Sequence, residues 1–152
     1  MDNKEYVIVE IIPSSISPLT GDILQISALK LKGLNLIDRF DYRVNLDSIE
    51  NIDLRNMISY DDDKFNHCDN GKDILSKFTD WTSNLDLLII DNEYTKNYLM
   101  NINNNMESIF KYLDMTYSDD VIDKVVDKYN LEYSNYIVDL LYEALIYESN
   151  KK

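Results

Sequence analysis

Residues that build the commonest small functional sites are scarce in this chain. It has one cysteine (Cys68), one histidine (His67) and three glycines (Gly21, Gly33 and Gly71) among 152 residues. A single cysteine cannot close an internal disulfide, and two Cys or His side chains cannot complete the four ligands of a structural zinc ion. Three scattered glycines cannot form a phosphate-binding loop. Internal disulfides, structural zinc sites within one chain and glycine-loop nucleotide sites are therefore excluded.

Positive charge is also in short supply. Fifteen Lys and Arg face 28 Asp and Glu, which gives a formal net charge of −13 and a pI near 4.3. Such a surface repels phosphate backbones, so nucleic acid is disfavoured as a partner unless a basic strip such as Lys30/Lys32 or Arg39/Arg43 opposes the field. The same charge allows the hypothesis of an acidic decoy, which imitates a nucleic-acid backbone in the basic groove of a partner.

Long apolar stretches are absent. The runs are short, such as Leu87 to Ile90, and none approaches the roughly 18 residues that span a bilayer. The first five residues lack the basic start and apolar run of a signal peptide. We therefore expect a cytoplasmic protein with no membrane partner. With 45% hydrophobic residues, the composition predicts one globular domain over residues 1–152.

Two polar features near the middle of the chain have simple interpretations. His67, beside Cys68, is the only imidazole that could serve a nucleophilic site, and we interpret it as a loop histidine. The carboxylates of Asp61 to Asp63 are too contiguous to enclose one ion. They predict a solvated loop.

Three β-strands are predicted at the start of the chain. The run Tyr6 to Ile12 (YVIVEII) is rich in β-branched residues and reads as a central strand that is buried on both faces. A second run, Ile23 to Lys32, and a third, Ile37 to Val44, follow after turns. The third alternates Phe40 and its apolar neighbours with charged residues, so the three strands predict an antiparallel meander whose last member has one wet face.

The periodicity then changes to that of helices. Apolar residues at helical spacing predict helices over residues 74–81, from about 93, over 121–129 and from 137 onward. A short apolar run, residues 85–90, has the length of a strand. The predicted order is three strands, a helix, a strand and three helices, and only the segment between Asn105 and Ser118 could supply a fifth strand.

Glu10 is the anomalous residue of the first strand. By the two-residue period it shares a face with Ile8 and Ile12, in the most hydrophobic segment of the chain. Burying an unpaired carboxylate costs several kcal/mol or neutralises the group. Glu10 therefore lies at the open end of the strand, pairs with a cation, or is protonated.

With these features in place, the chain resembles the DEDDh 3'-5' exonucleases, a proofreading family with a ribonuclease H-like fold. The resemblance starts with residues 7–18 (VIVEIIPSSISP), 21–32 (GDILQISALKLK) and 39–45 (RFDYRVN). It continues with residues 73–99, which are similar to a helix, a strand and the second motif of the family, and with residues 121–143, which resemble its last helices. The resemblance implies an α/β fold in which a mixed five-stranded sheet carries helices on both faces.

The catalytic motifs of that family are degenerate here. The family uses four carboxylates to hold two metal ions, and a histidine as general base. Matching the motifs places Glu10 at the first acid, Ile12 at the second, Thr95 at the third, and Ser134 in place of the histidine. Only Glu10 and Asp139 remain as catalytic remnants, and they imply either no cofactor or weakly bound Mg²⁺ or Mn²⁺.

The resemblance therefore implies a degenerate exonuclease that binds a protein partner, or a nucleic-acid end, without catalysis. An active metal-dependent exonuclease with rearranged ligands is the alternative, in which Asp91 or Glu93 compensates for the lost acids. In either case we expect Glu10 and Asp139 to approach each other beside a Lys, an Arg or a weakly held ion. Ile12 and Thr95 should line the same cleft. The sequence leaves the oligomeric state undetermined.

Overall fold

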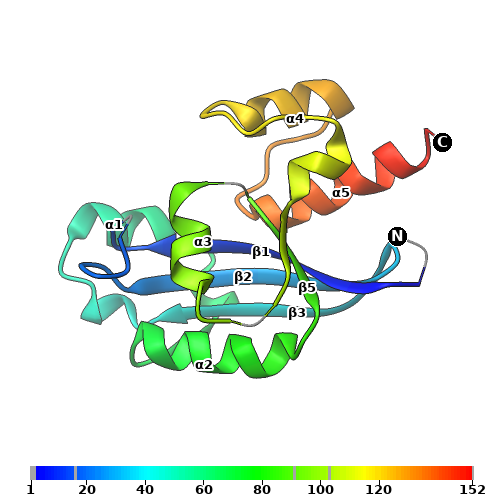
Figure 1. Cartoon of the computed structure of the whole chain (residues 1–152). Coiled ribbons are helices and arrows are strands. Elements are labelled where there is room, and N and C mark those ends of the chain that lie inside the picture. Colours follow the sequence, from blue (N-terminus) through cyan, green and yellow to red (C-terminus); the bar gives the residue numbers. More distant parts are fainter. Residues whose placement is uncertain (1–2, 16, 91, 103, 152) are drawn as a thin grey trace.

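The computed structural model describes residues 3–15, 17–90, 92–102 and 104–151. These residues fold around a mixed sheet (Figure 1). Its six strands are β1 (Glu5–Pro13), β2 (Ile23–Lys32), β3 (Asn35–Val44), β4 (Asn66–Cys68), β5 (Asp86–Ile89) and β6 (Met106–Ser108). The α-helices are α1 (Ile52–Ile58), α2 (Gly71–Thr82), α3 (Glu93–Leu99), α4 (Val121–Tyr129) and α5 (Ile137–Ser149), and the 3-10 helices are η1 (Leu46–Ser48), η2 (Asp62–Lys64) and η3 (Ile109–Leu113).

The topology places β1 inside the sheet, as its two-sided apolarity predicts. The strand order is β4-β3-β2-β1-β5-β6, and β1 pairs antiparallel with β2 and parallel with β5. Only β2 runs against the other five strands. The ends of β1, β3 and β5 therefore meet at one edge of the sheet, which we call the carboxyl edge. Ligands of open α/β sheets commonly bind at such an edge.

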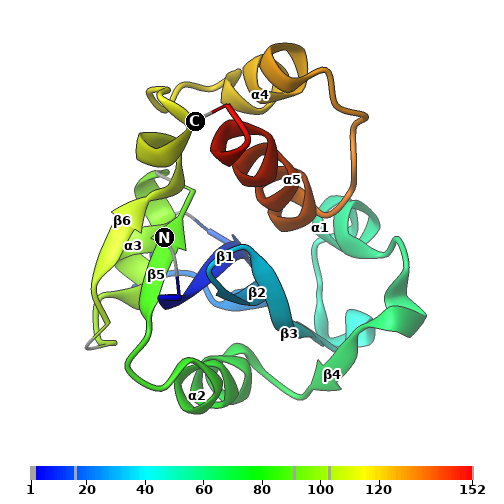
Figure 2. The same cartoon turned by 90° about the vertical axis from the view of Figure 1, so that its right-hand side faces the viewer.

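Helices cover both faces of the sheet, which confirms the predicted fold class (Figure 2). One core cluster joins Ile8 and Leu29 of the sheet to η3, α4 and α5. The other joins Val9 and its neighbours to α1, α2 and α3, for example through the fully buried Phe78 of α2. Among the described helices, none is both long and apolar enough to cross a membrane.

The sheet has six strands, so the prediction of five is wrong. β6 lies inside the segment from which a fifth strand was expected. The additional strand is β4, where Asn66, His67 and Cys68 pair parallel with the end of β3. His67 is thus a strand residue and does not lie in a loop. The sequence did not predict β4, because Asn66, His67 and Cys68 show no alternation of apolar and polar residues. Their pairing partner, β3, also lies more than twenty residues earlier in the chain.

Helix α1 was also missed, because seven residues are too few for a clear helical period. Its first turn is stabilised by Asn51, whose side chain accepts hydrogen bonds from the backbone N–H groups of Asp53 and Leu54 at 3.0 and 3.1 Å. An Asn at this position is a strong helix start. The helix borders the carboxyl edge, and its residue Met57 lines a cavity together with Glu10.

Candidate functional site

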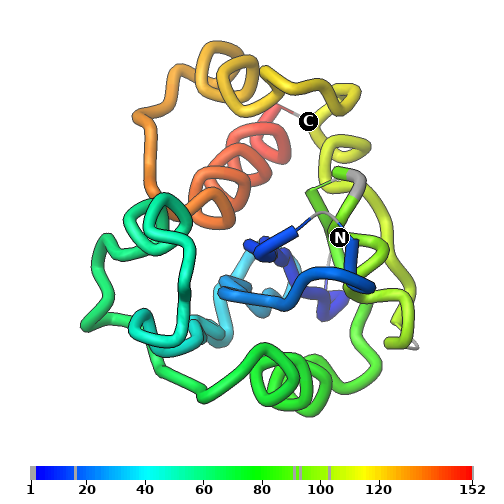
Figure 3. Tube along the Cα trace, turned by 90° about the vertical axis from the view of Figure 1, so that its left-hand side faces the viewer, coloured from blue at the N-terminus to red at the C-terminus, as the bar shows by residue number. Residues whose placement is uncertain are grey.

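Glu10 begins a row of polar side chains that crosses three strands. It pairs with Ser27 of β2, and Ser27 pairs with Asp41 of β3. Directly paired residues point to the same side of a sheet, so all three lie on the face that α5 covers. Ser27 Oγ and Asp41 Oδ1 are buried without a hydrogen-bond partner among the described residues. The row lies close to the carboxyl edge, which Figure 3 faces.

Burial dominates the electrostatics of Glu10. Desolvation raises the pKa of its carboxyl group to about 7, since the charged form is penalised where water is excluded. Within the described part of the chain, no hydrogen bond or ion pair is formed by this carboxyl group. The Glu10 charge contributes to raised pKa values of two nearby phenols, Tyr60 and Tyr94, whose largest cause is burial. Glu10 is therefore a carboxyl group with a substantial neutral fraction at neutral pH.

Asp139, the other remnant acid, is held by an arginine. Its two carboxylate oxygens accept hydrogen bonds from both terminal nitrogens of Arg39 on β3, at 2.6 and 3.2 Å. Arg39 Nε also lies 3.1 Å from Asp41 Oδ2. The hydrogen bond with Asp139 is the largest cause that raises the pKa of Arg39. Arg39 thereby links the first turn of α5 to β3.

The remaining motif positions are used in other ways. Ile12 is half-buried and lines a cavity with Glu10. Thr95 is buried, and both its backbone N–H (3.1 Å) and its hydroxyl donate to the side-chain oxygen of Asn92 at the start of α3. It is not among the described residues that line the cavity. Ser134 is exposed before α5, where its hydroxyl oxygen accepts a hydrogen bond from the N–H of Tyr136 at 3.0 Å.

The residues that the structure describes do not fit a two-metal centre. Within residues 3–15, 17–90, 92–102 and 104–151, no group of three or more His, Cys, Asp or Glu is arranged to hold a metal ion. The sequence analysis allows Asp91 or Glu93 to compensate for the lost metal ligands. Asp91 and the side chain of Glu93 lie outside the described part of the chain. Glu10 and Asp139 share no hydrogen bond in the described part of the structure. Two carboxylates, one of them paired with Arg39, do not provide the ligands of two adjacent ions.

An aromatic cluster joins the segment before α5 to the segment after α1. The Tyr60 hydroxyl donates to the carbonyl oxygen of Asn135 at 3.0 Å, and the ring of Tyr136 lies 6.0 Å from the rings of both Tyr60 and Phe65. Figures 2 and 3 show α1 beside the start of α5. These contacts fix the Ser134 segment across the carboxyl edge. Sequence reasoning did not find them, because the partners are about 75 residues apart.

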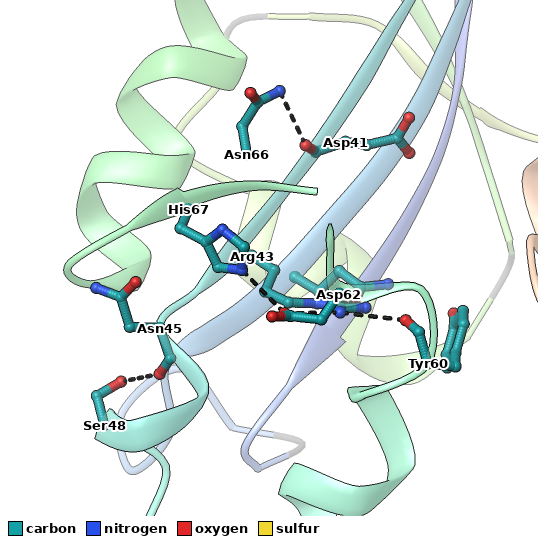
Figure 4. A network of polar contacts seen from close by, with 9 residues as sticks. Asp41, Arg43, Asn45, Ser48, Tyr60, Asp62, Asn66 and His67 are labelled. Carbon is teal, nitrogen blue, oxygen red and sulfur yellow. Dashed lines mark hydrogen bonds and ion pairs between the residues drawn. The ribbon is translucent and has the colours of Figure 1, made fainter. Parts of the chain in front are cut away.

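Arg43 is the centre of a polar network beside this cluster (Figure 4). Its side chain is fully buried. It donates to the side-chain oxygen of Gln25 at 2.6 and 3.0 Å, to the carbonyl of Tyr60 at 3.2 Å and to Asp62 at 3.1 Å. The guanidinium lies 3.8 Å from the ring centre of Phe65. The predicted wet face of the third strand is therefore covered at Arg43, because the segment after α1 folds over it.

Asp62 corrects a second expectation from the sequence. The run Asp61 to Asp63 was interpreted as a solvated loop, but Asp62 lies in η2 and bonds both Arg43 and His67. His67 Nε2 is 2.9 Å from Asp62 Oδ1, and this contact is the first cause that holds the pKa of Asp62 below its ordinary value, with Arg43 adding to it. The single histidine therefore serves a structural network.

The chain has the ribonuclease H-like fold of exonuclease I. It matches no protein-family model and no curated protein sequence. An exonuclease I complex with the inhibitor BCBP superposes with a TM-score of 0.58 at 10% identity, over 98% of this chain and 41% of that chain. An SSB/exonuclease I complex with the inhibitor CFAM gives 0.59 at 12% identity, over 97% and 41%. The zinc-bound E. coli exonuclease I complex with single-stranded DNA gives 0.53 at 12%, over 97% and 40%.

This chain therefore spans about two-fifths of the length of the exonuclease I chains that it matches. The superposition over nearly the whole of this chain establishes a common fold despite identity near 10%, whereas activity depends on the residues of the site. The expected fold is confirmed by these comparisons. The function must be argued from Glu10, Asp139 and their surroundings.

Proposed function

We propose that this chain is a catalytically inactive exonuclease-fold domain that works as a protein-binding module and needs no metal ion. One observation carries the proposal. Asp139, at the position that corresponds to the last acid of the DEDDh motifs, is engaged on both carboxylate oxygens by Arg39. A guanidinium that binds a carboxylate through two hydrogen bonds satisfies the charge that a metal ion would otherwise satisfy.

The other motif positions support the same proposal. Two-metal hydrolysis of a phosphodiester requires two ions about 4 Å apart that flank the scissile phosphate. Ile12 and Thr95 supply no carboxylate to either ion. Ser134 cannot replace an imidazole as a base that titrates near neutral pH. Glu10 alone is left without an ion-pair partner among the described residues, and one carboxylate cannot position two ions.

A protein partner is favoured over nucleic acid by the charge of the chain. The formal net charge of −13 lowers the rate of encounter with any polyanion. Of the basic strip that could have opposed this field, Arg43 is buried and Arg39 is paired with Asp41 and Asp139. These two side chains are therefore poorly placed to hold a phosphate backbone.

The proposal is tested by a nuclease assay on the purified chain. Single-stranded and mismatched DNA and RNA ends should not be degraded above background in millimolar Mg²⁺ or Mn²⁺, since two-metal hydrolysis requires two bound ions. The double variant Glu10→Gln/Asp139→Asn is the matched control. Hydrolysis that is robust in the wild type and abolished in this variant would establish the alternative, an active exonuclease with rearranged ligands. Activity that persists in the variant would come from a contaminating nuclease.

A metal titration gives an independent test. If Arg39 occupies Asp139, millimolar Mg²⁺ or Mn²⁺ should leave the thermal midpoint of the wild type unchanged, because ligands stabilise only the states that bind them. The variant Arg39→Gln frees the Asp139 carboxylate and should allow a small metal-dependent rise. A rise of several degrees in the wild type would contradict the proposal.

A further inference from the structure

A largely apolar cavity opens at the carboxyl edge, and Glu10 is one of the residues that line it. Its volume is about 400 Å³, and the lining side chains include Ile12, Pro13, Met57 and Tyr94. Met57 of α1 is 54% exposed, which is unusual for a large apolar side chain at the mouth of a cavity. We call this cavity the anchor pocket. Its size and lining suit one large apolar side chain.

A second cavity adjoins the first, and three carboxylates are part of its lining. It measures about 460 Å³, and its lining includes Asp22, Glu50 and Asp69. Ser14 lines both cavities, and α1 contributes Met57 to the first and Leu54 to the second, so the two cavities lie side by side and are together called the groove. None of the described residues that line either cavity is a lysine or an arginine. We call the second cavity the acidic pocket.

The wall between the two pockets is held in place before any ligand binds. The backbone N–H of Ser14 donates to the carbonyl of Asp22 at 2.9 Å, and the N–H of Asp22 donates to Ser14 Oγ at 2.9 Å. The Tyr98 hydroxyl donates to the carbonyl of Ser15 at 2.8 Å. A Cβ on Gly21 would lie 2.6 Å from Ser15 Cβ, so glycine is required for this close packing. A wall that is already ordered lowers the entropic cost of binding.

We infer that the groove binds a basic peptide segment of a partner protein, with one large apolar side chain in the anchor pocket and an adjacent lysine or arginine in the acidic pocket. This inference rests on the proposed function, since it gives the binding module a ligand class. Charge complementarity selects the occupant: three carboxylates without a lining cation attract a basic side chain and repel phosphate. The apolar pocket beside them adds specificity for a neighbouring Leu, Phe or Met.

Fluorescence polarisation with synthetic peptides tests this inference. The probes are nine-residue labelled peptides whose central Leu, Phe or Met is flanked on both sides by Lys and Arg. One comparison peptide replaces the central residue with Gly, and another replaces the flanking residues with Glu. At least one basic peptide with an apolar centre should bind saturably, and both comparison peptides should bind at least about tenfold more weakly, since each loses one of the two contacts.

Two pairs of variants locate the binding site on the protein. Met57→Glu places a charge at the anchor pocket, and Glu50→Lys reverses a charge in the acidic pocket; each should weaken binding at least about tenfold. Met100→Glu and Asp80→Lys are the matched controls, because Met100 is 67% exposed after α3 and Asp80 is exposed near the end of α2. Both controls should bind like the wild type, and circular dichroism verifies that all four variants are folded.

The inference would be overturned if no basic peptide bound saturably, if the Gly-centred peptide bound equally well, or if the control variants lost binding equally. Displacement of the peptide by a single-stranded DNA 12-mer at lower concentration than by unlabelled peptide would make nucleic acid the occupant, which also overturns it. The nuclease assay alone tests catalytic inactivity. A negative peptide experiment would therefore overturn this inference without deciding whether the chain is catalytically inactive.

Discussion

Glu10 and Arg43 lie in neighbouring rows on the same face of the sheet, and burial affects them differently. Arg43 is surrounded by acceptors from Gln25, Tyr60 and Asp62, so its charge is compensated. Glu10 has no such partner among the described residues, and its pKa is raised to about 7 by desolvation. One residue therefore stabilises the fold through its charge, whereas the other is more easily accommodated when it is neutral.

The first prediction follows from the raised pKa of Glu10. The folded state binds the proton more tightly than the unfolded state, whose pKa is near 4.5. The stability contributed by the protonated group is fully present below pH 4.5 and is lost as the pH rises through 7. Glu10→Gln should therefore raise the free energy of unfolding by about 3 kcal/mol at pH 8 and by almost nothing at pH 4.5.

Urea denaturation at the two pH values measures this difference. Glu5→Gln, on the exposed start of the same strand, serves as the control and should change stability by less than about 0.5 kcal/mol at either pH. A gain from Glu10→Gln that does not depend on pH would show that the charge of Glu10 is not the cause.

The second prediction concerns Arg43. Arg43→Met keeps most of the side-chain volume but leaves the Gln25 side chain and the Tyr60 carbonyl without their donor. Removing one member of a buried, charged network costs about 3–5 kcal/mol. We expect a loss of this size in chemical denaturation, whereas Lys32→Met, at an exposed position on β2, should be nearly neutral. A loss below about 1 kcal/mol would mean that the network contributes little.

At the scale of elements, α5 is attached to the sheet by polar contacts at separate points. Near its start, Asp139 binds Arg39 of β3, and the preceding Asn135 accepts from Tyr60. Further along, the Tyr142 hydroxyl donates to the carbonyl of Leu34 at 2.7 Å. The apolar core of α5, including the fully buried Leu141, packs on Ile8 and Leu29. The helix is thus placed by its apolar face, and the polar contacts set its register over the site.

The third prediction is that the Arg39–Asp139 pair makes only a modest contribution to stability. Arg39 and Asp139 side chains are 37% and 34% exposed, so solvent and salt screen the pair. A double-mutant cycle with Arg39→Gln and Asp139→Asn should give a coupling energy of about 0.5–1 kcal/mol that shrinks in 1 M NaCl. Glu143→Gln, exposed on the same helix, should show no coupling with Arg39→Gln. A coupling above about 3 kcal/mol would indicate that Arg39 is a principal determinant of the fold.

At the scale of the molecule, the chain combines a sheet and helices arranged as in exonuclease I with its own set of side chains at the carboxyl edge. The order of the strands and the position of the last helix bring the Glu10 strand and the Asp139 helix to one site. The side chains at that site form the Arg39–Asp139 ion pair and the aromatic cluster around Tyr136. They also line the anchor pocket and the acidic pocket. The fold therefore provides the location, and its lining determines what can bind.

The fourth prediction tests whether the location itself is intact. A variant with Glu10→Asp, Ile12→Glu, Thr95→Asp and Ser134→His restores the residue types of the DEDDh motifs, and adding Arg39→Gln releases Asp139. Of these two variants, only the five-residue one should show an Mn²⁺-dependent rise in thermal midpoint, and the rise should exceed that of Arg39→Gln alone, because Arg39 competes with the metal for Asp139 and the restored acids add ligands. Calorimetric Mn²⁺ titration of both variants provides the measurement. Equal metal binding with and without Arg39→Gln would show that Arg39 does not block the site.

Local patterns were sufficient to predict much of the framework. The dense β-branched run around Val9 predicts an inner strand, and β1 is one. The helical spacing over Val121–Tyr129 predicts α4 with the bounds that it has. Strand β4 and helix α1 were missed, since neither the three residues of β4 nor the seven of α1 show a clear apolar period. Where periodicity extends over about nine residues or more, sequence alone determines the element.

The candidate site was only partly predictable. Glu10 stood out because a carboxylate in an apolar strand violates a local rule, and Asp139 was assigned through the family motif. The sequence carries no signal that Arg39, 100 residues away from Asp139, would be its partner, or that Arg43 would be buried under Tyr60 and Asp62. Composition and periodicity report the environment along one segment. Partners in an ion pair or the walls of a groove come from distant segments, and only the tertiary structure decides which of them meet.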